Sequence, residues 1–162
     1  MTAEEPNVTI TINYLELAGA LLGFLALETK GIPLTYTRLA TFCDNMTTVL
    51  WAYKLRMSKS QISGYLLWFL GLRIHQAQAS SMILNHLAGV LNIMADIISR
   101  DFKQGQLFVA SQNGFMQYFN KQYPLTQNES WTECHVTKDQ VSCVIAFLCG
   151  KLQPMASLLI KH

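Results

Sequence analysis

The chain contains 162 residues, of which 51% are hydrophobic and 14% are charged, and its formal net charge is +2. This composition is typical of one folded domain with a large core, and it argues against an intrinsically disordered chain. The net charge is too small to indicate a polyanionic partner by itself. The basic residues of the first half form either ordinary surface charge or a modest basic face toward nucleic acid. These residues are Lys30, Arg38, Lys54, Arg56, Lys59 and Arg73.

Cysteine spacing and the first residues indicate an intracellular protein. The four cysteines show no Cys-x-x-Cys pair, so we expect reduced thiols rather than a zinc site or a disulfide framework. Glu4 and Glu5 stand where a secretory signal peptide would carry basic residues. The apolar runs 15–27 and 65–72 are shorter than the ~20 residues that span a bilayer. We therefore expect a cytoplasmic or nuclear protein that does not enter a membrane.

The first predicted elements are a short strand and a long helix. β-Branched residues at positions 8–12 favour a strand. Asn13 and, three positions later, Glu16 form a capping-box pattern, in which the glutamate reaches back to the N–H of the capping residue. We therefore predict a mostly buried helix over residues 14–28, and Gly31 after it is a residue that ends helices.

The central part of the chain alternates strands and helices. A strand, two helices and a second strand are predicted over residues 38–43, 46–55, 61–77 and 80–86. A loop over residues 87–89 and a short helix over residues 90–99 follow. This order is typical of an α/β fold with parallel strands, in which ligand sites form beyond the carboxyl ends of the strands. Asp44 and His86 lie at two such ends.

Residues 101–162 are predicted to form a helical appendage. Glycine and proline interrupt this part repeatedly, and helices are indicated at residues 115–123 and 140–152. We recognise no chemistry in its sequence. The chain is therefore divided into an α/β domain, residues 8–100, and a helical tail of unknown role, residues 101–162.

Three of the ten acidic residues stand at special positions: Glu16 on a buried helix, Asp44 at a strand end and Asp96 on the helix after a loop. Buried carboxylates are costly unless they are paired or bind a metal, and a divalent cation removes the repulsion between carboxylates that converge. Oxygen ligands suit Mg²⁺ or Mn²⁺. Taken singly, the three residues have simpler interpretations: a capping-box glutamate, a helix cap and an exposed helix position. His86, taken singly, is an ordinary core or loop histidine.

Three stretches together resemble a known family. They are Asn13-Tyr14-Leu15-Glu16-Leu17, Cys43-Asp44-Asn45, and His86 to Arg100, which reads His-x-x-Gly-x-x-Asn-x-x-Ala-Asp-x-x-Ser-Arg. In order and spacing they resemble the ribonuclease H domain of a retroelement reverse transcriptase, and they are most similar to the DIRS-like retrotransposon type. The resemblance covers roughly residues 8–100 and implies a ribonuclease H-like α/β fold.

The resemblance implies a nuclease that hydrolyses RNA in RNA–DNA hybrids with Mg²⁺ or Mn²⁺. It implies that Glu16, Asp44 and Asp96 bind the metal ions, with Asp44 bridging two of them. It also implies that His86 acts near the scissile phosphate, and that a polymerase domain lies upstream in a parent polyprotein. We expect nucleic-acid contacts from Asn45, Lys54, Arg56, Lys59 and Asn92.

The chain departs from the family at the first of the family's four carboxylates. That residue is an aspartate on an opening strand within a glycine-rich hairpin, and no aspartate precedes Asp44 in this sequence. We therefore expect a ribonuclease H-like fold that is truncated at its N-terminus and lacks the first hairpin, with impaired catalysis by this chain alone. A non-catalytic remnant or interaction module derived from a retroelement is the alternative. A helical bundle with accidental motif matches is a third interpretation.

Overall fold

A computed structural model of the chain describes residues 9–54, 60–93, 112–126, 129–132 and 134–152. The chain divides into two compact units. The first unit consists of Met1–His86 together with His135–His162, and the second unit consists of Leu87–Cys134. Each unit is described by itself.

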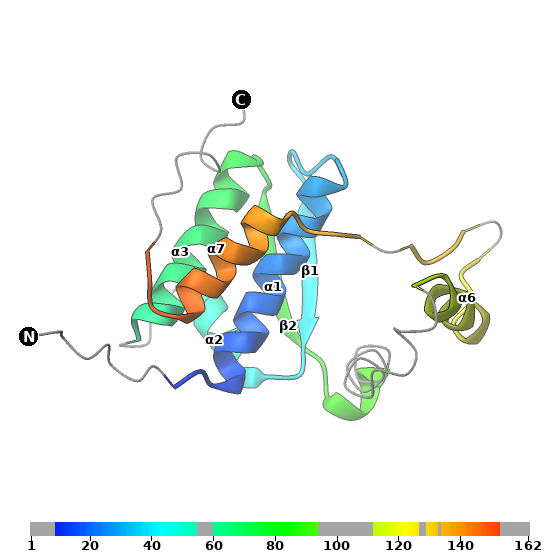
Figure 1. The fold of residues 1–162 in the computed structure, drawn as a ribbon, viewed down its shortest axis with the longest axis horizontal. Coiled ribbons are helices and arrows are strands. Elements are labelled where there is room, and N and C mark those ends of the chain that lie inside the picture. The colour runs from blue at the N-terminus through cyan, green and yellow to red at the C-terminus, as the bar shows by residue number, and fades with distance from the viewer. Residues whose placement is uncertain (1–8, 55–59, 94–111, 127–128, 133, 153–162) are drawn as a thin grey trace, which may run out of the picture. The chain divides into compact units, whose positions relative to one another are not determined.

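The first unit is a mixed α/β structure (Figure 1). Its elements are α1 (Ile12–Thr29), β1 (Arg38–Cys43), α2 (Met46–Lys54), α3 (Gln61–Gln76), β2 (Ser81–His86) and α7 (Lys138–Leu148). The two predicted strands and the two predicted helices between them are confirmed, with ends that differ by one residue at most. The predicted α/β class is therefore correct, whereas the ribonuclease H-like form of it stays a prediction.

The strands β1 and β2 form a two-stranded parallel sheet. Their register pairs Arg38 with Ser81 at one end and Cys43 with His86 at the other. Since α2 and α3 form the crossover between the strands, both strands run in the same direction and end at the same edge. Asp44 directly follows β1 at that edge. The sequence analysis predicted a ligand site at this position.

One face of this sheet packs against the helices and the other faces solvent. Leu39 and Met82, which are partners in the register, contact the hydrophobic core. On the opposite face Phe42 and Ile83 are 59% and 47% exposed. This alternation follows from the two-residue period of a strand. The helices therefore cover a single face of the sheet.

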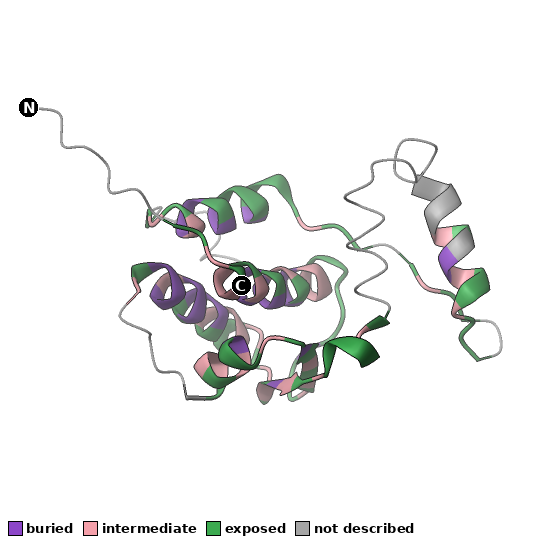
Figure 2. Cartoon of the chain, turned by 90° about the horizontal axis from the view of Figure 1, so that it is seen from below, coloured by how far each residue is buried: buried purple, intermediate pink, exposed green. Residues whose placement is uncertain are grey.

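The hydrophobic core lies where α1, α3 and α7 face one another (Figure 2). Phe24 of α1, Phe69 of α3 and Phe147 of α7 are all 0–1% exposed. The rings of Phe69 and Phe147 meet edge to face, with centroids 5.5 Å apart. Burying three aromatic side chains of this size supplies a large part of the stabilising apolar contact. The core thus joins helices from both ends of the chain.

An ion pair also joins α1 to α3. Arg73 donates from Nε and Nη2 to the carboxylate of Glu28, with N–O distances of 2.9–3.0 Å. Burial raises the pKa of Glu28, and the guanidinium of Arg73 opposes that rise through its hydrogen bonds and charge. The pair lies at the end of α1 that is remote from Glu16.

The helix α7 belongs to the core of the first unit, although the sequence predicted it as part of a tail. Thr137 and Gln140 form a capping box at its start, a signal that the sequence prediction missed when it began the helix at residue 140. Gly150 ends the helix with a φ of 71°, and Lys151 N–H donates to Ala146 O at 2.8 Å. The predicted extension to residue 152 is therefore wrong.

The start of α1 differs from the prediction. The described part of the predicted strand, residues 9–12, contains no strand, and α1 already begins at Ile12. Thr11 rather than Asn13 is at the N-cap position, and its backbone oxygen accepts from the N–H groups of Tyr14 and Leu15. Residues 9–12 pair with no strand among the described residues, and strand propensity is effective only where a neighbouring strand is present.

The second unit contains a short 3₁₀ helix, η1 (Gly89–Leu91), and the helix α6 (Gln112–Gln122). Most of the predicted helix 90–99 lies outside the described residues, and η1 occupies its beginning. The helix predicted at residues 115–123 is confirmed and starts three residues earlier. Asn120 joins α6 to the backbone of Trp131. Its Oδ1 accepts from Trp131 N at 2.6 Å, and its Nδ2 donates to Trp131 O at 3.0 Å.

By length and composition α1 is the one described helix that is able to cross a membrane. The 18-residue helix is longer than the apolar run 15–27 from which the sequence prediction was made. Its side chains Leu17, Leu21 and Leu25 are 0–1% exposed and pack in the core. The absence of a membrane partner stays a prediction.

We predict that Phe69→Ala lowers the free energy of unfolding of the first unit by about 3–5 kcal/mol, because it leaves a cavity between α3 and α7. Phe42→Ala is the matched control, since it removes the same side chain from a position that is 59% exposed. It should cost about 1 kcal/mol or less. Urea denaturation followed by circular dichroism measures both values. Equal losses in the two variants would contradict the assignment of Phe69 to the core.

Candidate functional site

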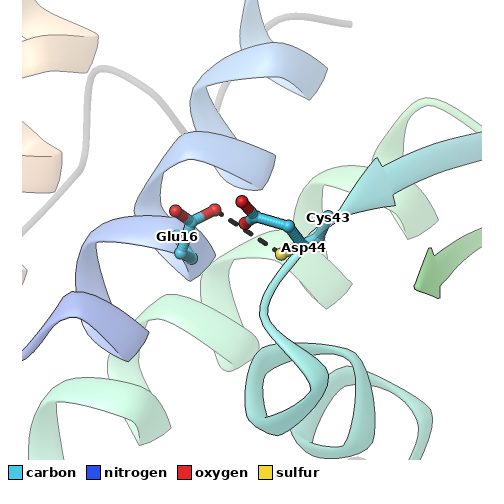
Figure 3. Close-up of side chains that lie close together, drawn as sticks. All are labelled: Glu16, Cys43 and Asp44. Carbon is cyan, nitrogen blue, oxygen red and sulfur yellow. Dashed lines mark hydrogen bonds between the residues drawn. The ribbon is translucent and has the colours of Figure 1, made fainter. Parts of the chain in front are cut away.

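Glu16 and Asp44 come together at the carboxyl end of β1. Asp44 directly follows the last residue of that strand, and Glu16 lies near the start of α1. The ligand atoms of Glu16, Cys43 and Asp44 all lie within 4.8 Å of one another. Figure 3 shows the two carboxylates facing each other above the thiol of Cys43. Residues that are distant in the sequence are therefore brought into one cluster by the packing of α1 against α2 and the loop that follows β1.

Glu16 does not serve as a capping-box residue. The cap position of α1 is Thr11, which makes no side-chain capping hydrogen bond. The carboxylate of Glu16 instead accepts a hydrogen bond from Cys43 Sγ, with an S–O distance of 3.5 Å (Figure 3). The simple interpretation of Glu16 from the sequence is thus wrong, and the side chain is directed at the strand end.

Asp44 does not cap the following helix either. Asn45 takes that role, because its Oδ1 accepts from Thr48 N at 3.2 Å at the start of α2. Asp44 is exposed at the edge of the sheet. The carboxylate of Asp44 is therefore available to bind a solute at this edge.

The cluster is acidic and has no cationic partner among the residues that the structure describes. The described ion pair of the chain is Arg73 with Glu28, at the remote end of α1. Two carboxylates that face each other without a cation repel, and a bound cation relieves this repulsion. The electrostatics of the edge thus favour a positively charged ligand.

Cys43 is a member of this cluster that the sequence prediction missed. Its thiol is buried, and burial is the main cause that raises its pKa to about 11. The carboxylates of Glu16 and Asp44 raise the pKa further, and a backbone hydrogen bond from Asn45 opposes them. At neutral pH the thiol is therefore protonated and acts as a hydrogen-bond donor. Its place directly before Asp44, at a core-facing strand position, was the signal in the sequence.

The donor set fits a hard divalent cation. Two carboxylates from α1 and the β1–α2 loop offer oxygen ligands, which Mg²⁺ and Mn²⁺ prefer. A protonated thiol is not a ligand for such ions. Glu16 and Asp44 are accordingly the residues that would bind the ion, and Cys43 would orient Glu16 through its hydrogen bond.

His86 lies at the same edge of the sheet. Its register partner is Cys43 on the neighbouring strand, and the side chain of His86 is exposed. The imidazole is thus one strand away from the acidic cluster and accessible to a solute. Its role in catalysis stays a prediction.

The remaining predicted site residues either lie outside the described residues or belong to the second unit. Asp96, Arg56 and Lys59 lie outside the described residues. Lys54 is the last residue of α2, and its side chain also lies outside the described part. Asn92 follows η1 in the second unit and is half-buried there.

The first unit is therefore a mixed α/β structure with an acidic pair at the end of a parallel strand. Comparison of the chain with protein-family models, with curated proteins and with solved structures gave no match. The resemblance to ribonuclease H thus depends on the motifs of the sequence alone.

We predict that Glu16→Gln lowers the pKa of Cys43, because it removes a negative charge beside the thiol. The rate of alkylation by iodoacetamide at pH 9 should rise by a few-fold, since the thiolate is the reactive form. Mass spectrometry of the alkylated peptides measures it. Cys143 is the internal control, because burial alone raises its pKa to about 11. An unchanged rate at Cys43 would show that the two side chains do not interact in solution.

Proposed function

We propose that this chain is the ribonuclease H portion of a retroelement reverse transcriptase of the DIRS-like type. The proposed reaction is the hydrolysis of the RNA strand in an RNA–DNA hybrid. The convergence of Glu16 and Asp44 at the end of β1 is the observation that supports this proposal most. Both residues belong to motifs that resemble the family's catalytic motifs.

The proposed metal ligands are Glu16, Asp44 and Asp96. Bound divalent ions supply an activated water and neutralise the charge that develops on the phosphate. Glu16 and Asp44 contribute the negative charge that retains the ions. Cys43, whose side chain is buried, orients Glu16 through its hydrogen bond. In this proposal the exposed His86 acts near the scissile phosphate from the neighbouring strand.

The proposed substrate contacts are charge interactions with the backbone of the hybrid. Lys54, Arg56 and Lys59 follow one another in the sequence between the acidic cluster and α3. Cationic side chains bind phosphates without regard to sequence, and contacts to the 2′-hydroxyl distinguish the RNA strand. Binding of the hybrid should therefore weaken strongly as the salt concentration rises. In this proposal an upstream polymerase domain is the partner within the same polyprotein.

A non-catalytic interaction module is the second candidate. It is favoured by one observation, namely that two carboxylates, Glu16 and Asp44, meet among the described residues, whereas the site of the family that the motifs resemble has four. A site with fewer carboxylates retains cations less strongly and neutralises less charge on the phosphate. The two candidates differ in whether divalent cations bind and whether RNA in a hybrid is cleaved.

We predict that Asp44→Asn abolishes Mn²⁺ binding and reduces cleavage of an RNA–DNA hybrid by about 100-fold or more, because it removes one of the two described carboxylates that would hold the ions. Asp139→Asn is the matched control, since Asp139 lies on the first turn of α7 and outside the cluster. Cleavage is followed with a labelled RNA strand, in the 162-residue chain and in a protein that carries an aspartate-bearing β-hairpin before residue 8. Cation binding is measured by calorimetry.

The outcomes separate the two candidates. Cleavage that is stronger with the hairpin and lost in Asp44→Asn supports the nuclease. Cleavage that persists in Asp44→Asn contradicts the site. A wild-type chain that neither binds Mn²⁺ nor cleaves the hybrid, with or without the hairpin, favours the interaction module.

A further inference from the structure

A polar network joins the start of α1 to the loop after β1. Asn45 Nδ2 donates to Asn13 Oδ1 at 2.6 Å, and Thr48 Oγ1 donates to the backbone oxygen of Asn13 at 3.2 Å. Thr48 is 0% exposed. Asn13 and Asn45 are half-buried, and the loss of these hydrogen bonds would leave polar groups with reduced access to water. The network therefore fixes the position of the loop after β1 relative to the start of α1, because hydrogen bonds are directional and hydrophobic contacts are not.

Each partner of the network stands next to one carboxylate of the acidic cluster. Asn13 and Glu16 are three residues apart on α1, so they share one face of the helix. Asn45 directly follows Asp44. The distance between the loop and α1 at Asn13 and Asn45 thus determines how closely Glu16 approaches Asp44.

We infer that Asn13 and Asn45 are positioning residues, which set the separation of Glu16 and Asp44 and through it the affinity of this edge for a divalent cation. The part that concerns the cation depends on the proposed function. The part that concerns the geometry of the loop does not. Asn45 was expected to contact nucleic acid, and this inference gives its amide group a role within the protein.

The two functions of the Asn45 side chain lie on different atoms. Oδ1 caps α2 by accepting from Thr48 N, and Nδ2 reaches Asn13. Serine is a good helix cap but has no amide donor. Asn45→Ser therefore removes the hydrogen bond from Asn45 Nδ2 to Asn13 Oδ1 and keeps the cap. Asn13→Ala removes the same hydrogen bond by deleting its acceptor.

The first experiment measures Mn²⁺ binding by electron paramagnetic resonance. Asn13→Ala and Asn45→Ser should each weaken binding about 10-fold, as is common when residues that orient metal ligands are changed. The double variant should be no weaker than either single variant, because both remove one bond. Thr29→Val is the matched control, since it removes a hydrogen bond between α1 and Gln140 at the opposite end of the same helix. It should bind Mn²⁺ as the wild type does.

The second experiment needs no metal. The buried thiol of Cys43 contacts the backbone N and O of Asn45 in the loop after β1. If the loop is released in Asn13→Ala and Asn45→Ser, the thiol becomes more accessible and its alkylation by iodoacetamide should accelerate. Cys143 is buried in the core and reports any general opening of the fold. Its rate should stay constant in all variants. Asn13→Asp keeps an acceptor for Asn45 Nδ2 and should restore the slow rate at Cys43.

The two measurements distinguish the failure of each proposal. Wild-type-like Mn²⁺ binding in both single variants overturns the positioning role, provided that Asp44→Asn has lost binding. A wild-type chain that does not bind Mn²⁺ contradicts the proposed function and the affinity part of the inference, and the alkylation rates then decide the geometric part. An unchanged rate at Cys43 in both variants overturns that part, and an increase confined to Cys43 supports it.

Discussion

The packing of α1 against α3 and α7 is the constraint on which the rest of the structure depends. Leu17 and Leu21 are 0% exposed and fix the rotation of α1 about its axis. The rotation that buries Leu17 turns the preceding Glu16 toward the end of β1, because neighbouring residues on a helix point about 100° apart. A helix packed differently would present Glu16 to solvent, and no acidic pair would form. The core therefore determines the site as well as the stability of the first unit.

The parallel pairing of β1 and β2 is the second constraint. It brings the carboxyl ends of both strands to one edge, where Asp44 leaves β1 and His86 ends β2. A buried thiol, a half-buried carboxylate and an exposed carboxylate then lie together without a described cationic partner. This combination keeps the thiol protonated and makes the edge attractive to a cation. The function proposed for the chain follows from this site and its motifs, since a mixed α/β architecture by itself hosts many functions.

The polar network of Asn13, Asn45 and Thr48 connects these two constraints. It fastens the loop after β1 to the helix that the core has oriented. Hydrophobic contacts tolerate small shifts between α1 and the loop, whereas a hydrogen bond loses strength within a few tenths of an ångström. Binding of a small cation requires ligands at a defined separation, and this network provides the directional contact that sets it.

The sequence by itself determined the strands at residues 38–43 and 80–86 and the helices between them, because strand and helix periodicity are local properties. The alternation of strands and helices then predicted that the strands are parallel. It also singled out Glu16 and Asp44. It misplaced the start of α1, since residues 9–12 pair with no strand among the described residues. The tertiary structure alone decided that α7 completes the core and that Glu16 accepts a hydrogen bond from Cys43. These outcomes depend on contacts between residues that are distant in the sequence, and local patterns carry no information about such contacts.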